Sequence, residues 1–185
     1  MQFCPNSRLV LPSSIIAMVL GLLVASCGMN NAVDRTKFDA LNRAATTIQA
    51  STSVGVGLVK FQELVQVLAT EYALASQKVT TPAEKELLSR YQTVVEIYRD
   101  SLLVWNRDIT SHGYSTGVAG LPAERIHVNE ELEPVVTRYQ LTTELHTQEY
   151  SGTQYRSIPK STIQLLWAKA EAELRAIGSR TTTPS

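Results

Sequence analysis

The side chain with the most distinctive chemistry in this sequence is the thiol of Cys27, just after an apolar run from Ile15 to Ala25. A thiol can form a thioether with a lipid, and the small side chains of Ala25 and Ser26 leave the backbone before Cys27 open to cleavage. The apolar run has 11 residues, whereas a helix needs about 20 to cross the hydrocarbon of a bilayer. A single basic residue, Arg8, precedes the run. This pattern favours a cleaved export signal over a permanent transmembrane anchor.

The four residues Val24-Ala25-Ser26-Cys27 resemble the lipobox of bacterial lipoproteins. The resemblance implies that residues 1–26 are a cleaved signal peptide and that the Cys27 thiol carries a diacylglycerol. It also implies an acylated amino terminus, and three acyl chains exceed the two signals that stable anchoring requires. In lipoproteins of bacteria with two membranes, an aspartate after the cysteine favours the inner membrane. Because Gly28 stands there, we expect a cell-envelope protein lipid-anchored to the outer membrane and facing the periplasm. The alternative is a free or buried cysteine after an uncleaved helix.

The composition after Cys27 limits the partners and the stabilising bonds of the mature chain. Loss of residues 1–26 removes one basic residue and no acidic one, so a neutral chain acquires about one negative charge. This balance argues against nucleic acid, which requires clustered Lys and Arg. Cys4 leaves with the signal, so no disulfide is expected. Residues 27–34 are expected to be a short lipidated tether, which holds the domain near the bilayer as its partner.

Glu124 and His127 have the spacing of a Glu-x-x-His motif. On a helix this spacing puts a carboxylate and an imidazole on one face, and ferritin-like bundles use two such pairs around two metal ions. The motif occurs once here, because Thr143 stands where a second glutamate would precede His146. A surface pair near a helix start is therefore preferred, with Glu124 and His127 as weak metal-site candidates and no cofactor expected.

The longest irregular stretch of the mature chain is residues 110–121, with three glycines and Pro122 after it. Long loops in compact domains are often functional, and His112 and Tyr114 could contact a ligand. The alternative interpretation is a solvent-exposed connector.

Sequence motifs for catalysis are absent. The chain has no Gly-x-Ser-x-Gly, no His-Glu-x-x-His and no phosphate-binding loop, so no enzyme is expected. Two functions remain open. One is a structural or interaction lipoprotein that docks an envelope protein or a second copy of itself. The other is a periplasmic module that binds or senses a ligand or metal.

Hydrophobic periodicity predicts an all-α fold, an antiparallel bundle of about four amphipathic helices over residues 35–178. The first helix is expected to run from Arg35 to about Gln77. It carries two apolar stripes that are out of register, the second beginning at Val54, so a kink, break or close crossing is expected at Gly55 and Gly57. The glycines suggest either close packing against a neighbouring helix, which we favour, or a surface for a partner.

The other helices are expected to follow in order. Thr81-Pro82-Ala83-Glu84 has the residues of an N-terminal capping box with proline at the first helical position. Beyond it, Tyr91, Tyr98 and Trp105 recur every seven residues, which indicates core positions. A third helix is expected to start within residues 129–134, where three acidic residues suit a helix start, to carry His146 and to end near Tyr150. A polar connector over residues 153–157 and a last helix ending at Gly178 complete the domain, with residues 179–185 disordered.

Overall fold

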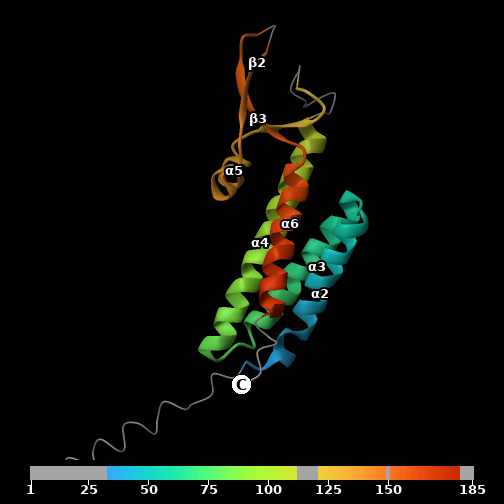
Figure 1. Ribbon diagram of the computed structural model, residues 1–185, viewed down its shortest axis with the longest axis vertical. Coiled ribbons are helices and arrows are strands. Elements are labelled where there is room, and N and C mark those ends of the chain that lie inside the picture. Colours follow the sequence, from blue (N-terminus) through green and yellow to red (C-terminus); the bar gives the residue numbers. More distant parts are fainter. Residues whose placement is uncertain (1–32, 112–120, 149–150, 180–185) are drawn as a thin grey trace, which may run out of the picture. The chain divides into compact units, whose positions relative to one another are not determined.

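The computed structural model describes residues 33–111, 121–148 and 151–179, and these are mostly helical with one small sheet (Figure 1). The signal peptide, Cys27, the loop residues His112 and Tyr114, and residues 180–185 of the expected disordered tail lie outside them. The elements are η1 (Arg35–Phe38), α2 (Asp39–Val54), α3 (Leu58–Ser76), α4 (Pro82–Ser111), β1 (Arg125–Val128), α5 (Glu133–Tyr139), β2 (Glu144–Thr147), β3 (Gln154–Pro159) and α6 (Thr162–Ser179). None of the described helices combines the length and apolarity needed to cross a membrane.

The four long helices lie side by side, each antiparallel to the next along the chain (Figure 1). α2 packs on α3, α3 on α4, and α4 most extensively on α6. α4 has 30 residues against 16 in α2 and 19 in α3. α4 is therefore long enough to extend past the α2–α3 hairpin, and the sheet packs on α4 through β1.

The expected single first helix is wrong, because the chain reverses direction where the two apolar stripes change register. α2 ends at Val54 and α3 begins at Leu58. Gly55 has φ +94° and ψ 127°, a backbone conformation that essentially only glycine adopts. A Cβ built at Gly55 or Gly57 meets no atom within 4 Å. The two glycines therefore do not serve to make room for a neighbouring helix, and the favoured interpretation, close packing against such a helix, is wrong.

Substitution of the two glycines should separate backbone strain from packing. We expect Gly55→Ala to lower the free energy of unfolding by about 1–3 kcal/mol, the cost of holding a side-chain-bearing residue in this region. Gly57→Ala is the matched control, since Gly57 has φ −81° and open space around it. Urea denaturation of both variants measures the difference. Equal losses would contradict the assignment of the turn to Gly55.

The predicted start of α4 is confirmed. The Glu84 N–H donates to Thr81 Oγ1 at 3.2 Å, and Glu84 Oε2 accepts the Thr81 N–H at 3.2 Å, which completes the capping box. The structure adds a contact that sequence spacing does not indicate: Lys37 Nζ lies 2.7 Å from Glu84 Oε1. The hydrogen bond from Lys37, with that from the Thr80 N–H, lowers the pKa of the buried Glu84 carboxyl to about 2. One carboxylate thus joins the start of the folded domain to the start of α4.

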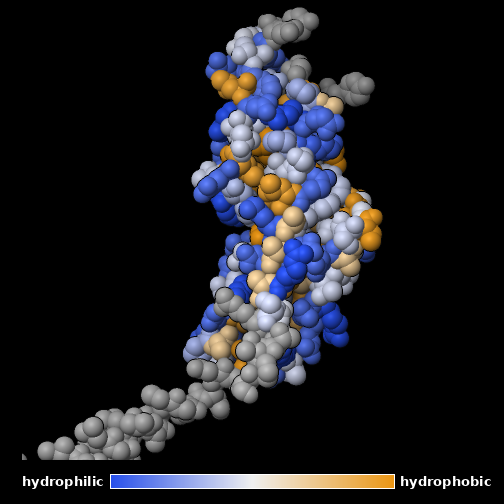
Figure 2. All heavy atoms as spheres, in the orientation of Figure 1, coloured by the Kyte–Doolittle hydropathy of each residue, from blue (hydrophilic) through white to orange (hydrophobic). Residues whose placement is uncertain are grey.

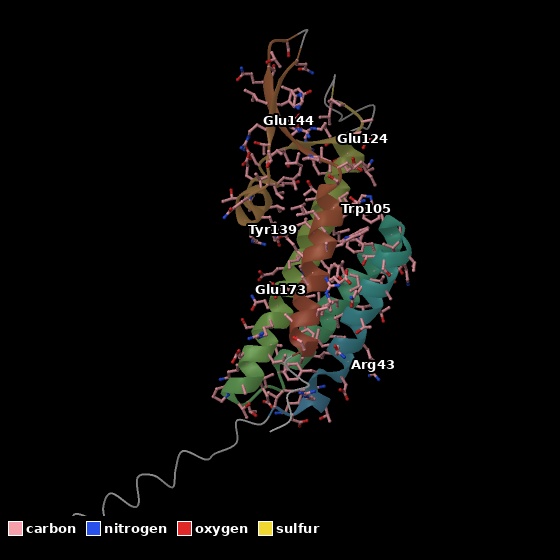
Figure 3. The ribbon with its side chains drawn as sticks, viewed as in Figure 1. Arg43, Trp105, Glu124, Tyr139, Glu144 and Glu173 are labelled. Carbon is pink, nitrogen blue, oxygen red and sulfur yellow. The ribbon has the colours of Figure 1, made fainter. Side chains whose placement is uncertain are left out.

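The predicted aromatic core is also confirmed. Tyr91 and Tyr98 are buried, and Trp105 packs against the core from the same side of α4. Phe61 of α3 is fully buried between Tyr98, Trp105 and Trp167, with ring centroids 6.1, 5.6 and 5.3 Å away. Figure 3 shows Trp105 on α4. Three helices therefore meet at one group of rings.

The all-α prediction is wrong between α4 and α6, where the chain forms a three-stranded antiparallel sheet in the order β1-β3-β2. The third helix ends at Tyr139, because Gln140 adopts a left-handed conformation (φ 51°). His146 consequently lies on β2, and the expected polar connector forms β3. Ile126 of β1 pairs with Ile158 of β3, and both side chains are fully buried. The signal for β1 is the polar–apolar alternation of Arg125-Ile126-His127-Val128, which has the period of a strand.

Candidate functional site

The two candidate metal ligands do not share a helical face. Glu124 lies in the turn before β1, where Figure 3 labels it, and His127 is the third residue of that strand. The i, i+3 spacing brings two side chains together on a helix but not on a strand, where sides alternate. Within the described ranges, no three His, Cys, Asp or Glu side chains are grouped so as to hold a metal ion. The geometric basis for a Glu-x-x-His metal site is therefore absent.

Instead, the sheet gathers polar side chains from all three strands on one face. In the strand register, Ser157 lies between His127 and Glu144, and His146 pairs with Tyr155. The His146 ring stacks on Tyr155 with centroids 5.2 Å apart and planes 18° apart, while His127 meets Tyr155 edge-on at 5.8 Å. We call this set, together with Arg125, the sheet cluster. Sequence spacing does not indicate it, because its members are brought together only by strand pairing.

The serine and histidine of the sheet cluster have part of the geometry of a nucleophile and its base. His146 Nε2 lies 2.7 Å from Ser157 Oγ, and Arg125 Nε donates to the same oxygen at 3.1 Å. In hydrolytic triads a carboxylate orients the other ring nitrogen. Here the carboxylate of Glu144 lies 3.9 Å from Nε2 itself and 2.6 Å from Arg125 Nη2. Ser157 is fully buried and therefore closed to a substrate. The arrangement satisfies buried polar groups and does not position a nucleophile.

His127 connects the sheet cluster to α4 through Arg107. Arg107 Nε donates to the His127 carbonyl oxygen at 3.2 Å, and Arg107 Nη2 contacts His127 Nδ1. Since a guanidinium can only donate, Nδ1 must act as the acceptor, which requires a neutral imidazole. Burial lowers the pKa of His127 below its ordinary value, and the charge of Arg107 lowers it further.

We expect the thermal stability of the protein to fall as the pH is lowered through and below about 6.5, the ordinary imidazole pKa. The unfolded chain takes up a proton there, whereas folded His127 resists it, so acid favours the unfolded state. The other polar groups of the sheet cluster facing His127 are Tyr155 and Ser157. The stability that comes from the lowered pKa of Glu84 is lost at lower pH, between its ordinary pKa of 4.5 and its folded pKa of about 2. His127→Asn keeps an acceptor near Nδ1 without titrating, so its melting temperature between pH 8 and pH 5 should change less than that of the wild type. Parallel curves for the two proteins would contradict this role.

A second surface feature is the tip of the α2–α3 hairpin, which we define as residues 51–59. Val54 is 85% exposed and Val59 is 74% exposed. The described ranges contain seven exposed large hydrophobic side chains, and four of them belong to the α2–α3 hairpin. Besides Val54 and Val59 at the tip, these are Val67 and Leu74 further along α3. Figure 2 shows hydrophobic side chains gathered where the hairpin ends, at the right-hand edge of the view. The assignment of Val54 to a buried stripe is therefore wrong.

The hydroxyl groups of the hairpin tip already have partners within α2. Ser51 Oγ donates to the Thr47 carbonyl at 2.9 Å, Thr52 Oγ1 to the Gln49 carbonyl at 2.9 Å, and Ser53 Oγ to the Ala50 carbonyl at 2.8 Å. Covering a donor that is already hydrogen-bonded costs far less than covering a free one. No charged residue occurs between Arg43 and Lys60. This uncharged stretch is the signal in the sequence that could have identified the tip.

The structure thus defines a mostly helical protein with a small antiparallel sheet, a sheet cluster joined by hydrogen bonds and ion pairs, and an exposed apolar hairpin tip. No protein-family model, curated protein or solved structure matches the chain.

Proposed function

We propose that this chain is a lipid-anchored protein of the bacterial cell envelope that docks a partner protein through the tip of its α2–α3 hairpin. The observation that carries the proposal is the exposure of Val54 and Val59 in an uncharged stretch. Contiguous exposed apolar surface commonly marks a protein interaction site. The partner surface of matching chemistry is an uncharged apolar pocket on another envelope protein.

The anchor in this proposal is Cys27, on the lipobox resemblance, and Gly28 favours the outer membrane. Five residues separate Cys27 from Val33, where the described domain begins. The hairpin tip lies at the opposite end of α2 from that beginning (Figure 1). With 16 residues and a rise of about 1.5 Å per residue, α2 separates the two by about 24 Å. The membrane-side end and the partner-side end are therefore distinct parts of an antiparallel helical bundle.

The proposal includes no catalytic step. The serine–histidine pair described above is closed to substrate, and Arg125 and Glu144 are engaged with each other and with that pair. These polar groups support a structural role of the sheet cluster.

Site-specific photo-crosslinking in intact cells tests the docking surface. A photoreactive amino acid at position 59 should give a covalent adduct with one envelope protein. The same amino acid at position 145 should not, although Leu145 on β2 is 63% exposed. Burying a valine contributes about 1.5–3 kcal/mol, so Val54→Lys should reduce the adduct from position 59 by about tenfold or more. Its melting temperature should be unchanged.

The result that contradicts the proposal is equal crosslinking from positions 59 and 145, or monomer only from both. An adduct of twice the monomer mass would instead identify the partner as a second copy of this chain.

A further inference from the structure

One arginine of α4 binds both the backbone and the side chain of a residue on β1. In the strand order β1-β3-β2, β1 is an edge strand, which pairs only with β3 among the described strands. Arg107 reaches β1 at His127, where Nε donates to the backbone carbonyl oxygen at 3.2 Å and Nη2 contacts the ring Nδ1. Both side chains are half-buried. We call these two bonds the edge contact.

The two bonds of the edge contact form and break together. Nε and Nη2 belong to one planar guanidinium group, which presents its N–H groups as a rigid fork. A neutral imidazole accepts a hydrogen bond at Nδ1, whereas a protonated imidazole carries a hydrogen there and a positive charge that faces the guanidinium. Protonation of His127 therefore removes the side-chain bond and, because the fork is rigid, the backbone bond as well.

The charged and titratable groups next to His127 come from α4 and β3. On α4, Arg107 is followed by Asp108, whose carboxylate lies 2.8 Å from Lys160 Nζ. On β3, Tyr155 meets the His127 ring edge-on with centroids 5.8 Å apart. Burial lowers the pKa of His127, and the positive charge of Arg107 lowers it further. The folded protein therefore favours the neutral ring that the edge contact requires.

The other histidine of the sheet cluster can take up a proton without such a loss. His146 Nε2 lies 2.7 Å from Ser157 Oγ and 3.9 Å from the carboxylate of Glu144. Arg125 Nε donates to the same hydroxyl oxygen, which has two lone pairs and can accept both donors. A protonated His146 would thus keep its hydroxyl partner and be attracted by Glu144. Of the two histidines in the described ranges, only His127 loses a contact on protonation.

We propose that the edge contact is a pH-sensitive switch, in which protonation of His127 below about pH 6.5 frees Arg107 from β1 while the helices stay folded. Opening moves one half-buried side chain, and such local opening requires less free energy than global unfolding. The open form takes up a proton that the closed form excludes. The ratio of open to closed molecules should therefore rise by up to about tenfold between about pH 7.5 and about pH 5.5. The switch is independent of the proposed lipid anchor and of the hairpin tip.

Nuclear magnetic resonance of the full chain can follow the edge contact itself. A hydrogen-bonded Arg107 Nε–H exchanges slowly with water, and the Nε–H of Arg43 is the reference at each pH, since Arg43 on α2 is exposed (Figure 3). We expect the protection of Arg107 relative to Arg43 to fall by roughly five- to tenfold between about pH 7.5 and about pH 5.5. The backbone amide of the buried Phe61 should remain more protected than Arg107 at both pH values.

His127→Asn keeps an acceptor without titrating, so the protection of Arg107 should no longer change with pH. His146→Gln is the matched control, because its amide can reach Ser157 in place of Nε2, and the pH dependence should persist. If His127→Asn does not fold, Arg107→Gln provides a second measurement, since the pKa of the His127 ring should then rise toward its ordinary value of about 6.5.

Three results would overturn the proposal. The first is a protection of Arg107 that is the same at both pH values in the wild type. The second is a pH dependence that survives in His127→Asn. The third is an Arg107 Nε–H that exchanges as slowly as the Phe61 amide, since the edge contact would then open only when the whole protein unfolds.

Discussion

Replacing Phe61 by alanine is expected to lower the free energy of unfolding by about 3–5 kcal/mol, the usual cost of removing a buried aromatic ring. The ring is fully buried and is the point at which α3 meets Trp105 of α4 and Trp167 of α6. The two indoles also contact each other, with centroids 5.5 Å apart. Since a domain is stabilised by only about 5–15 kcal/mol in total, this loss should leave the protein close to unfolding at 37 °C.

The chain provides its own probe for this experiment. It contains two tryptophans, and both contact Phe61, so tryptophan fluorescence during urea denaturation reports on this part of the core. Val59→Ala is the matched control, two residues earlier on the same helix and 74% exposed. It should change the free energy of unfolding by no more than about 0.5 kcal/mol. A loss below about 1 kcal/mol for Phe61→Ala would show that the ring cluster does not hold the helices together.

Replacing Cys27 by serine is expected to move the protein from the membrane fraction to the soluble fraction almost completely. A hydroxyl cannot form the thioether on which the proposed anchor depends. Each buried methylene of an acyl chain contributes about 0.8 kcal/mol, so loss of the lipid removes most of the membrane affinity. The measurement is cell fractionation combined with intact-protein mass spectrometry, and the variant should lack the lipid mass.

Cys4→Ser is the matched control, because it removes the other thiol of the chain within the expected signal peptide. It should leave the mature mass and the membrane association unchanged. If Cys27→Ser showed the same mass and the same membrane association as the wild type, the lipid anchor would be refuted. The hairpin tip would then need a different cellular setting, although its geometry would stand.

The two experiments address different parts of the proposal. Phe61 supports the rigid packing of the α2–α3 hairpin that presents Val54 and Val59, whereas Cys27 decides whether that hairpin is held at a membrane. A variant that remains folded but is released from membranes should keep its hairpin tip. Its affinity for a purified partner should then be unchanged, while crosslinking in cells decreases.

Local sequence determined the long helices and their inner faces. The capping box at Thr81, the buried positions of Tyr91 and Tyr98, and the interruption near Gly55 follow from residue preferences over a few turns, and the structure agrees with each. Such features depend on contacts between neighbours in the chain, which is why a single sequence is sufficient to predict them.

Only the tertiary structure decided which way the chain turns and which strands pair. Gly55 could have permitted a kink or a reversal, and the choice of a hairpin depends on α3 burying Phe61 against α4 and α6. The three strands have four to six residues each and become stable through one another, so the juxtaposition of His127, Ser157 and Glu144 could not be predicted from spacing. Exposure of Val54 has the same cause, since no other element of the described ranges covers its side chain at the end of the hairpin. An apolar side chain is buried only where another element covers it, and that is a property of the whole fold.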